Sequence, residues 1–329
     1  MKRLALSTLE ASLLLTERIH FPLLEEVELR SINLHSFQHA PNLHTLSLLS
    51  IPVRNLSAFN FPWKQLAVVE LRGNQLSGDK VQEIFEICTN LQELRFSLSP
   101  GDHFGYFVPP LKAPVLEKLS IILPHHSAYY NLGYNVFSSI TCPALTFLHI
   151  EGSKYFDGKY RCTWPRDQLK EFISRSEHLT TLTIKSAPLA DSDIIQVLIQ
   201  LPSLLHLTVS DPGIHEKSPI TPYLMQRLRV LGNESSTSSL TLVQKLQTLS
   251  LTFCSGTTKE SFNDKDFVDM VVSRWQVPNG SGNRIESLRS VFLRFINRDP
   301  DRETYTPLKQ LDEAGMKVVV LDSHFQVVV

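Results

Sequence analysis

Leucines and other apolar residues recur along the chain in one short pattern. The pattern is L-x-x-L-x-L, with conservative replacements, and the stretch from Leu66 to Leu71 is one copy. The eleven copies begin at Met1, Leu24, Leu43, Leu66, Leu91, Leu116, Leu145, Leu179, Leu204, Leu246 and Leu288. One copy would arise easily by chance, but eleven copies spread over the whole chain indicate an internal repeat.

The spacing within each copy predicts a β-strand. Side chains alternate along a strand, so the fourth and sixth positions of the string point into the same core. The first position enters that core from the bend before the strand. Successive copies are 19 to 42 residues apart. One repeat cannot bury its own apolar side chains, so the core forms only when neighbouring repeats stack on it.

The segments between the strings have the periodicity of helices. In Asp79–Cys88 the apolar residues Val81, Ile84, Phe85 and Cys88 fall on one helical face. Further helices are expected at Asp167–Arg175, Asp191–Leu201, Pro222–Leu231, Asp264–Trp275 and Thr304–Ala314. The run Met316–Asp322 predicts a last strand.

This alternation is the pattern of a leucine-rich repeat, and Leu66–Leu76 is its best copy because Asn74 stands where the repeat has its asparagine. We therefore expect an α/β fold, a single leucine-rich repeat solenoid over residues 1–329 with about 11 irregular repeats. A curved parallel sheet would form the concave side, and helices and irregular turns the convex side. Long insertions are expected at about 210–243 and 255–284, with loops at Asn233–Ser239 and Val277–Asn283. A closing unit is expected at about 260–329.

Several stretches resemble the repeat region of F-box/leucine-rich repeat proteins that are abundant in mushroom-forming fungi. They are CTNLQELRF, CPALTFLHI, LPSLLHLTV and the block FVDMVVSRWQV…IESLRSVFLRF…LKQLDEAGMKVVVLD from Phe267 to Asp322. The resemblance implies a substrate adaptor of a cullin–RING ubiquitin ligase. In that family the repeats recruit the substrate and an N-terminal F-box binds Skp1.

The F-box itself has no counterpart in residues 1–329. The family's F-box opens with a pattern such as L-P-x-E-L-L-x-x-I-F, and VQEIFEIC (Val81–Cys88) has only a faint echo of it between two repeat strings. Met1 already falls in a string, and the first string lacks the polar cap that repeat arrays normally carry. We expect either a truncated chain or a repeat-only relative. Skp1 binding is not expected from this chain alone.

Charge and cysteine usage narrow the class of protein. The chain has 32 Lys and Arg against 33 Asp and Glu, so no general attraction to nucleic acid or membrane is implied. Its cysteines, Cys88, Cys142, Cys162 and Cys254, form no C-x-x-C pair, which is typical of a reducing compartment. With no signal-peptide pattern and no membrane-length apolar run, a cytoplasmic or nuclear location is expected.

Motifs for catalysis and cofactor binding are missing from the sequence. It has no G-x-x-x-x-G-K-[ST], G-x-G-x-x-G, H-E-x-x-H or G-x-S-x-G string. His35, His39 and His44 and the pair His125–His126 match no zinc spacing. We expect no enzyme activity, cofactor or metal. The alternative is an enzyme or small-ligand-binding protein with a pocket formed by the 210–243 insertion.

The remaining candidate is a protein-binding surface on the strands. The third, fifth and seventh positions of each string face the concave side, and between Val68 and Glu151 they mix charged with apolar and aromatic residues, as binding hot spots do. The candidate binding residues are Val68, Glu70, Arg72, Glu93, Arg95, Lys118, Ile122, Phe147, His149 and Glu151. The pairs Glu70–Arg95 and Arg72–Ser97 are equally candidates for structural cross-strand ladders.

Overall fold

The structure is a computed structural model of the whole chain. It describes residues 2–6, 20–30, 37–49, 56–98, 111–123, 128, 132–152, 164–211, 213, 218–230, 241–254, 262–276 and 285–329. Several expected features lie outside the described residues, namely the loops Asn233–Ser239 and Val277–Asn283, His35, His125, His126, Cys162 and the side chain of Asn74.

The protein is an α/β protein whose residues group into two compact units. The first unit comprises Met1–Leu148 and Asp167–Glu177, and the second comprises His149–Arg166 and His178–Val329. That the two units form one continuous solenoid over residues 1–329 stays a prediction.

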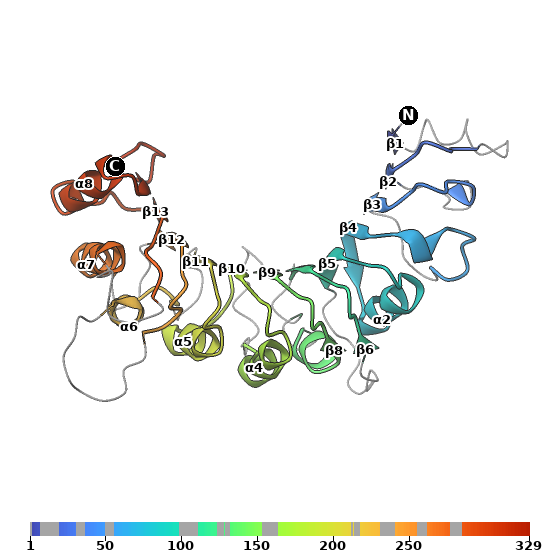
Figure 1. Cartoon of the computed structure of the whole chain (residues 1–329), viewed down its shortest axis with the longest axis horizontal. Helices are drawn as coiled ribbons and strands as arrows, with labels where there is room; N and C mark the ends of the chain where they lie inside the picture. The colour runs from blue at the N-terminus through green and yellow to red at the C-terminus, as the bar shows by residue number, and fades with distance from the viewer. Residues whose placement is uncertain are drawn as a thin grey trace. The chain divides into compact units, whose positions relative to one another are not determined.

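In the first unit, parallel strands follow one another in chain order (Figure 1). They are β1 (Arg3–Leu6), β2 (Glu26–Arg30), β3 (Thr45–Leu49), β4 (Val68–Leu76), β5 (Glu93–Leu98) and β7 (Lys118–Ile122), and the unit boundary falls within β9 (Phe147–Glu151). Helices α2 (Gly78–Ile87) and α4 (Arg166–Ser174) lie on one side of these strands. The short elements are η2 (Trp63–Gln65), η3 (Leu132–Phe137) and a separate parallel pair, β6 (Leu111–Lys112) with β8 (Ile140–Thr141).

The second unit repeats this arrangement. Its strands β10 (Thr181–Lys185), β11 (His206–Asp211), β12 (Thr248–Cys254), β13 (Ser290–Ile296) and β14 (Lys317–Leu321) are all parallel neighbours. Helices α5 (Asp191–Ile199), α6 (Pro222–Leu228), α7 (Asp264–Trp275) and α8 (Thr306–Glu313) lie on one side of them (Figure 1).

Burial follows the alternation that the strings predict. Val27, Leu29, Leu46 and Leu48 are at most 2% exposed, whereas the residues between them are partly exposed. Every string contains a strand, and the predicted helices and final strand are confirmed to within a few residues. The β6–β8 pair and η3 were not predicted because they are short and lie outside the repeated string.

In each unit, the described helices lie on one side of the strands only. We call the other side the open face. It is formed by the third, fifth and seventh positions of the strings, as expected. No helix in the described part of the chain has the length and hydropathy needed to cross a membrane.

Candidate protein-binding face

All ten candidate binding residues lie on strands at the open face, and none of them is fully buried. Eight belong to the first unit: Val68, Glu70 and Arg72 on β4, Glu93 and Arg95 on β5, Lys118 and Ile122 on β7, and Phe147 on β9. His149 and Glu151 belong to the second unit. The structure thus places these side chains, and their role in binding stays a prediction.

The register of the parallel strands arranges the first unit's candidates in rows. Val68, Glu93 and Lys118 occupy one row across β4, β5 and β7, and Glu70 and Arg95 are neighbours in the next row. Adjacent strands are about 4.8 Å apart, so side chains within a row are close enough to touch.

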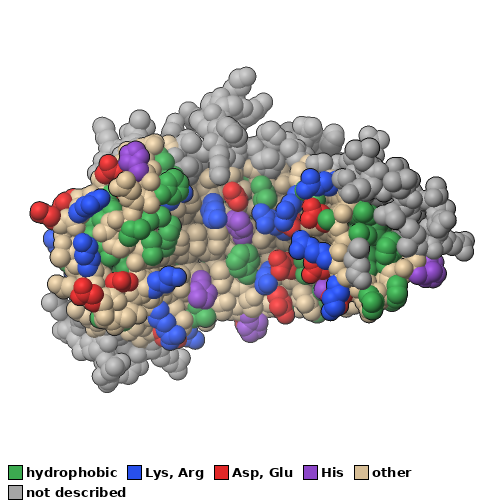
Figure 2. Space-filling view, turned by 90° about the horizontal axis from the view of Figure 1, so that it is seen from above, with side chains coloured by type: hydrophobic (Ala, Val, Ile, Leu, Met, Phe, Trp, Pro, Cys, Tyr) green, Lys and Arg blue, Asp and Glu red, His purple; other side chains and the backbone are tan. Residues whose placement is uncertain are grey.

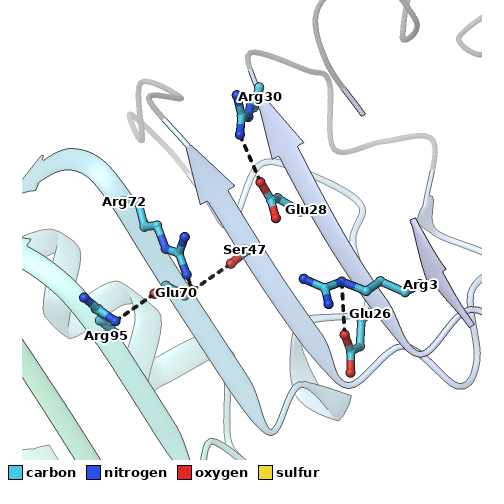
Figure 3. Close-up of polar contacts among 8 residues, drawn as sticks. All are labelled: Arg3, Glu26, Glu28, Arg30, Ser47, Glu70, Arg72 and Arg95. Atoms are coloured by element: carbon cyan, nitrogen blue, oxygen red, sulfur yellow. Dashed lines mark hydrogen bonds and ion pairs between the residues drawn. The ribbon is translucent and has the colours of Figure 1, made fainter. Parts of the chain in front are cut away.

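Glu70 lies at the centre of a polar network that joins three strands (Figure 3). Its Oε2 accepts hydrogen bonds from Arg72 Nη2 at 2.7 Å and from Ser47 Oγ at 3.0 Å. Its Oε1 lies 3.4 Å from Arg95 Nη1, so the expected Glu70–Arg95 pair is confirmed. The Glu70 side chain is only 16% exposed. Its negative charge is compensated within the sheet by Arg72 and Arg95.

This network lowers the pKa of Glu70 from its ordinary value of 4.5. Partial burial alone would raise this pKa. The hydrogen bonds from Arg72 and Ser47, with the positive charges of Arg72 and Arg95, outweigh that effect. The hydrogen bond to Glu70 also raises the pKa of Arg72. Glu70 is consequently ionised at neutral pH.

The expected pair of Arg72 with Ser97 is wrong. The register of β4 against β5 shifts between Leu71 and Gln75, so that Gln75, and not Arg72, lies opposite Ser97. Gly73 lies in this irregularity with φ of 69°, a conformation that glycine adopts without strain. Arg72 instead pairs with the carboxylate two residues before it on its own strand.

Further ion pairs join charged side chains on the same open face. They are Arg3 with Glu26 at 3.5 Å, Arg30 with Glu28 at 3.4 Å and Lys118 with Glu93 at 3.1 Å. Figure 2 looks onto this face and shows basic and acidic side chains gathered over the first unit, toward the right of the view. The face is thus lined by paired charges.

Sequence reasoning left five members of this arrangement, Arg3, Glu26, Glu28, Arg30 and Ser47, out of the candidate set. Glu28 and Arg30 stand at the same positions of their string as Glu70 and Arg72 do, and Ser47 stands one strand away from Glu70 in register. The shared position in the string was the signal that could have found them.

The two candidates of the second unit lie close together. Nε2 of His149 is 3.6 Å from Oε2 of Glu151, and both side chains are largely buried. The described strands of this unit present hydroxyl groups on their open face, from Thr181, Thr183, Thr208, Ser210, Thr248, Ser250, Thr252 and Ser290, beside residues such as Lys185, His206, Phe292 and Arg294. The ion pairs of arginine and lysine with glutamate on the open face of the described strands all lie in the first unit.

Two of the histidines that were compared with zinc-binding spacings, His39 and His44, contact other side chains. The ring of His39 stacks on His20 with centroids 5.0 Å apart, and Nδ1 of His44 lies 3.0 Å from Oγ1 of Thr45. Within the described ranges, no three His, Cys, Asp or Glu side chains come together in a way that could hold a metal ion.

The alternative of a ligand pocket in the 210–243 insertion stays a prediction, because residues 212, 214–217 and 231–240 lie outside the described part. A groove of about 430 Å³ lies elsewhere, in the first unit, lined by residues that include Phe61, Pro62, Trp63 and Ile87. The remaining lining residues are polar, namely Ser57, Lys64, Gln65 and Glu86.

Comparison with known proteins assigns no family. No protein-family model matches the chain, and no curated protein matches its sequence. Any functional proposal therefore depends on the fold, the burial pattern and the contacts of the open face.

Proposed function

We propose that this protein is a non-catalytic protein-binding module, a leucine-rich repeat solenoid of about eleven irregular repeats. Its partner protein binds the open face of the first unit. The observation that carries the proposal is the placement of Glu70, Arg72 and Arg95, with their neighbours, on a face that the described helices leave uncovered. A broad array of partly exposed strand side chains suits recognition of another protein.

The electrostatics of this face support binding rather than catalysis. Its ionisable groups pair with one another along and between strands, as Glu70 does with Arg72 and Arg95. A catalytic site would need an acid, a base or a nucleophile that converges on a concave pocket. Paired charges on an exposed strand surface instead favour orientation and selectivity in protein association.

The role that we propose within the cell is that of a substrate receptor, as in F-box/leucine-rich repeat proteins of ubiquitin ligases. It rests on the sequence resemblance of the repeats. Co-purification with Skp1 is a separate trial of this role. We expect no Skp1 to be retained by residues 1–329, since the F-box pattern is missing from them.

A pull-down with a charge-swapped variant tests the binding face. The variant carries Glu70→Arg, Arg72→Glu and Arg95→Glu, which keeps opposite charges adjacent, and its fold is checked by circular dichroism. The matched control swaps two exposed charges on α4 with Lys170→Glu and Glu171→Lys. We expect the open-face variant to lose the partner and the control to keep it. Retained binding by the open-face variant would exclude this face.

A further inference from the structure

The ion pairs on the open face of the first unit share an asymmetry in exposure. The Arg72 side chain is 52% exposed and its partner Glu70 16%, and Arg30 is 62% exposed against 24% for Glu28. Arg95, Lys118 and Arg3 are likewise more exposed than the carboxylates they pair with. The basic group is therefore the more exposed member of each pair, and Glu28 and Glu70 are the most buried of the carboxylates.

The cause of this asymmetry in exposure is the length of the side chains. Arginine and lysine side chains are longer than glutamate side chains. In a pair attached to the same sheet surface, the positive charge therefore lies farther from the sheet than the negative charge. A guanidinium also has five N–H donors in a planar fork. The contact of Arg72 with Glu70 engages Nη2, and a guanidinium that is half exposed can present its other donors to an incoming acceptor.

We propose that the segment bound by this face is an acidic peptide of the partner protein. Its Asp and Glu carboxylates would accept hydrogen bonds from Arg30, Arg72, Arg95 and Lys118. The inference rests on the proposed function, since it names the chemistry of the partner at that same face. Arg–carboxylate contacts are charge-assisted and directional, so they would supply both attraction and register.

The charge balance of the face favours an acidic peptide over a nucleic acid. Five basic residues (Arg3, Arg30, Arg72, Arg95 and Lys118) stand against four carboxylates (Glu26, Glu28, Glu70 and Glu93). A nucleic acid strand would lay evenly spaced phosphates over both kinds of group. A peptide can place its carboxylates at the guanidinium groups alone.

Fluorescence anisotropy with the full chain tests the inference. The probe is a labelled peptide of alternating Glu and Ser, and the control probe has Gln in place of every Glu. We expect the Glu peptide alone to bind, and to bind more weakly at about 300 mM than at about 50 mM salt, because exposed charges are screened. The double variant Arg30→Gln/Lys118→Gln should weaken binding by about three- to tenfold. Lys170→Gln, on α4, should leave it unchanged.

A second variant distinguishes an effect of charge on peptide binding from an effect of misfolding. Glu93→Gln removes an exposed carboxylate that competes with the peptide for Lys118. We expect it to tighten binding by about twofold, which a folding defect would not do. Unchanged or weaker binding of the Glu peptide to this variant would count against the inference.

Two other results would overturn the inference. One is equal binding of the Glu and Gln peptides, and the other is tighter binding of a single-stranded oligonucleotide than of the Glu peptide. The proposed function is judged separately by the charge-swap pull-down. If the swap abolishes partner capture while the Glu peptide fails to bind, only the acidic chemistry is wrong. If the swap leaves capture intact, the binding face itself is wrong.

Discussion

Glu70 and Arg72 lie two residues apart on β4 and meet on the open face through a hydrogen bond of 2.7 Å. Arg95 of β5 approaches the other oxygen of the same carboxylate at 3.4 Å. The alternation that buries Val69 and Leu71 in the core is also what brings these charged residues together on the opposite face. The repeat thus specifies the core and the candidate binding surface at once.

Replacing Glu70 with Gln should lower the free energy of unfolding by about 1–2 kcal/mol, because the negative charge that strengthens the contacts with Arg72, Arg95 and Ser47 is lost. Urea denaturation measures this change. The matched control is Glu26→Gln, whose side chain is 44% exposed and lies 3.5 Å from Arg3; it should cost less than about 0.5 kcal/mol. Equal losses for the two variants would show that the Glu70 network adds nothing.

The contribution of Glu70 should depend on pH in one direction. Its pKa is lower in the folded chain than the value of 4.5 for the unfolded chain, so ionised Glu70 stabilises the fold. This stabilisation is complete above the unfolded pKa and is lost as the pH falls through the lower folded pKa. The difference in melting temperature between the wild type and Glu70→Gln should therefore narrow below pH 4.5. A difference that widens on acidification would contradict the shift.

The strands and most helices could be predicted because they follow from periodicity. Helix α7 begins and ends at the predicted residues, Asp264 and Trp275, and Asn263 Oδ1 caps its N-terminus by accepting from the backbone N–H of Lys265. The same apolar positions that define the local pattern also form the shared core. Tertiary packing therefore favours the same strands and helices as the local pattern does.

The register shift in β4 and the asymmetry in exposure within the ion pairs could not be predicted. The shift depends on local backbone geometry at Gly73, which leaves the apolar string from Leu66 to Leu71 unchanged. The strand pattern assigns Glu70 and Arg72 to the same face but does not say which charge lies outside. That depends on side-chain length and on neighbours from other strands, such as Ser47 and Arg95.

Arg274, on α7, should be needed for the stability of the second unit. Its guanidinium is completely buried and donates to the backbone carbonyls of Leu228 at 2.5 Å, Leu242 at 2.6 Å and Val243 at 3.3 Å. Burial lowers the pKa of Arg274 to about 10, so it remains charged at neutral pH. Arg274→Met would remove the donor to the Leu228 and Leu242 carbonyls, while Val243 keeps its bond from the backbone N–H of Leu246. It should lower the free energy of unfolding by about 3–5 kcal/mol.

The control for this prediction is Lys265→Met on the same helix. Lys265 is 75% exposed, and its replacement should change the free energy of unfolding by less than about 0.5 kcal/mol. Urea denaturation of both variants makes the comparison. A mild effect of Arg274→Met would mean that water replaces the buried guanidinium.

Gly213 and Gly315 form a second matched pair, because both have positive φ but differ in their surroundings. A Cβ atom at Gly213 would lie 2.8 Å from Sγ of Cys254, whereas a Cβ at Gly315 would have no described atom within 4 Å. Gly213→Ala should therefore lower the free energy of unfolding by at least about 1 kcal/mol more than Gly315→Ala does. Equal melting temperatures for the two variants would show that Cys254 moves aside at no cost.

The central claim, that the partner protein binds the open face of the first unit, is tested most directly by site-specific photo-crosslinking. A benzoylphenylalanine replaces Val68 on β4 in one variant and Lys170 on α4 in the other. Each full chain is irradiated with its captured partner, and the crosslinked peptides are mapped by mass spectrometry. We predict crosslinks to the partner from position 68 and none from position 170. Crosslinks from position 170 alone would contradict the proposed face.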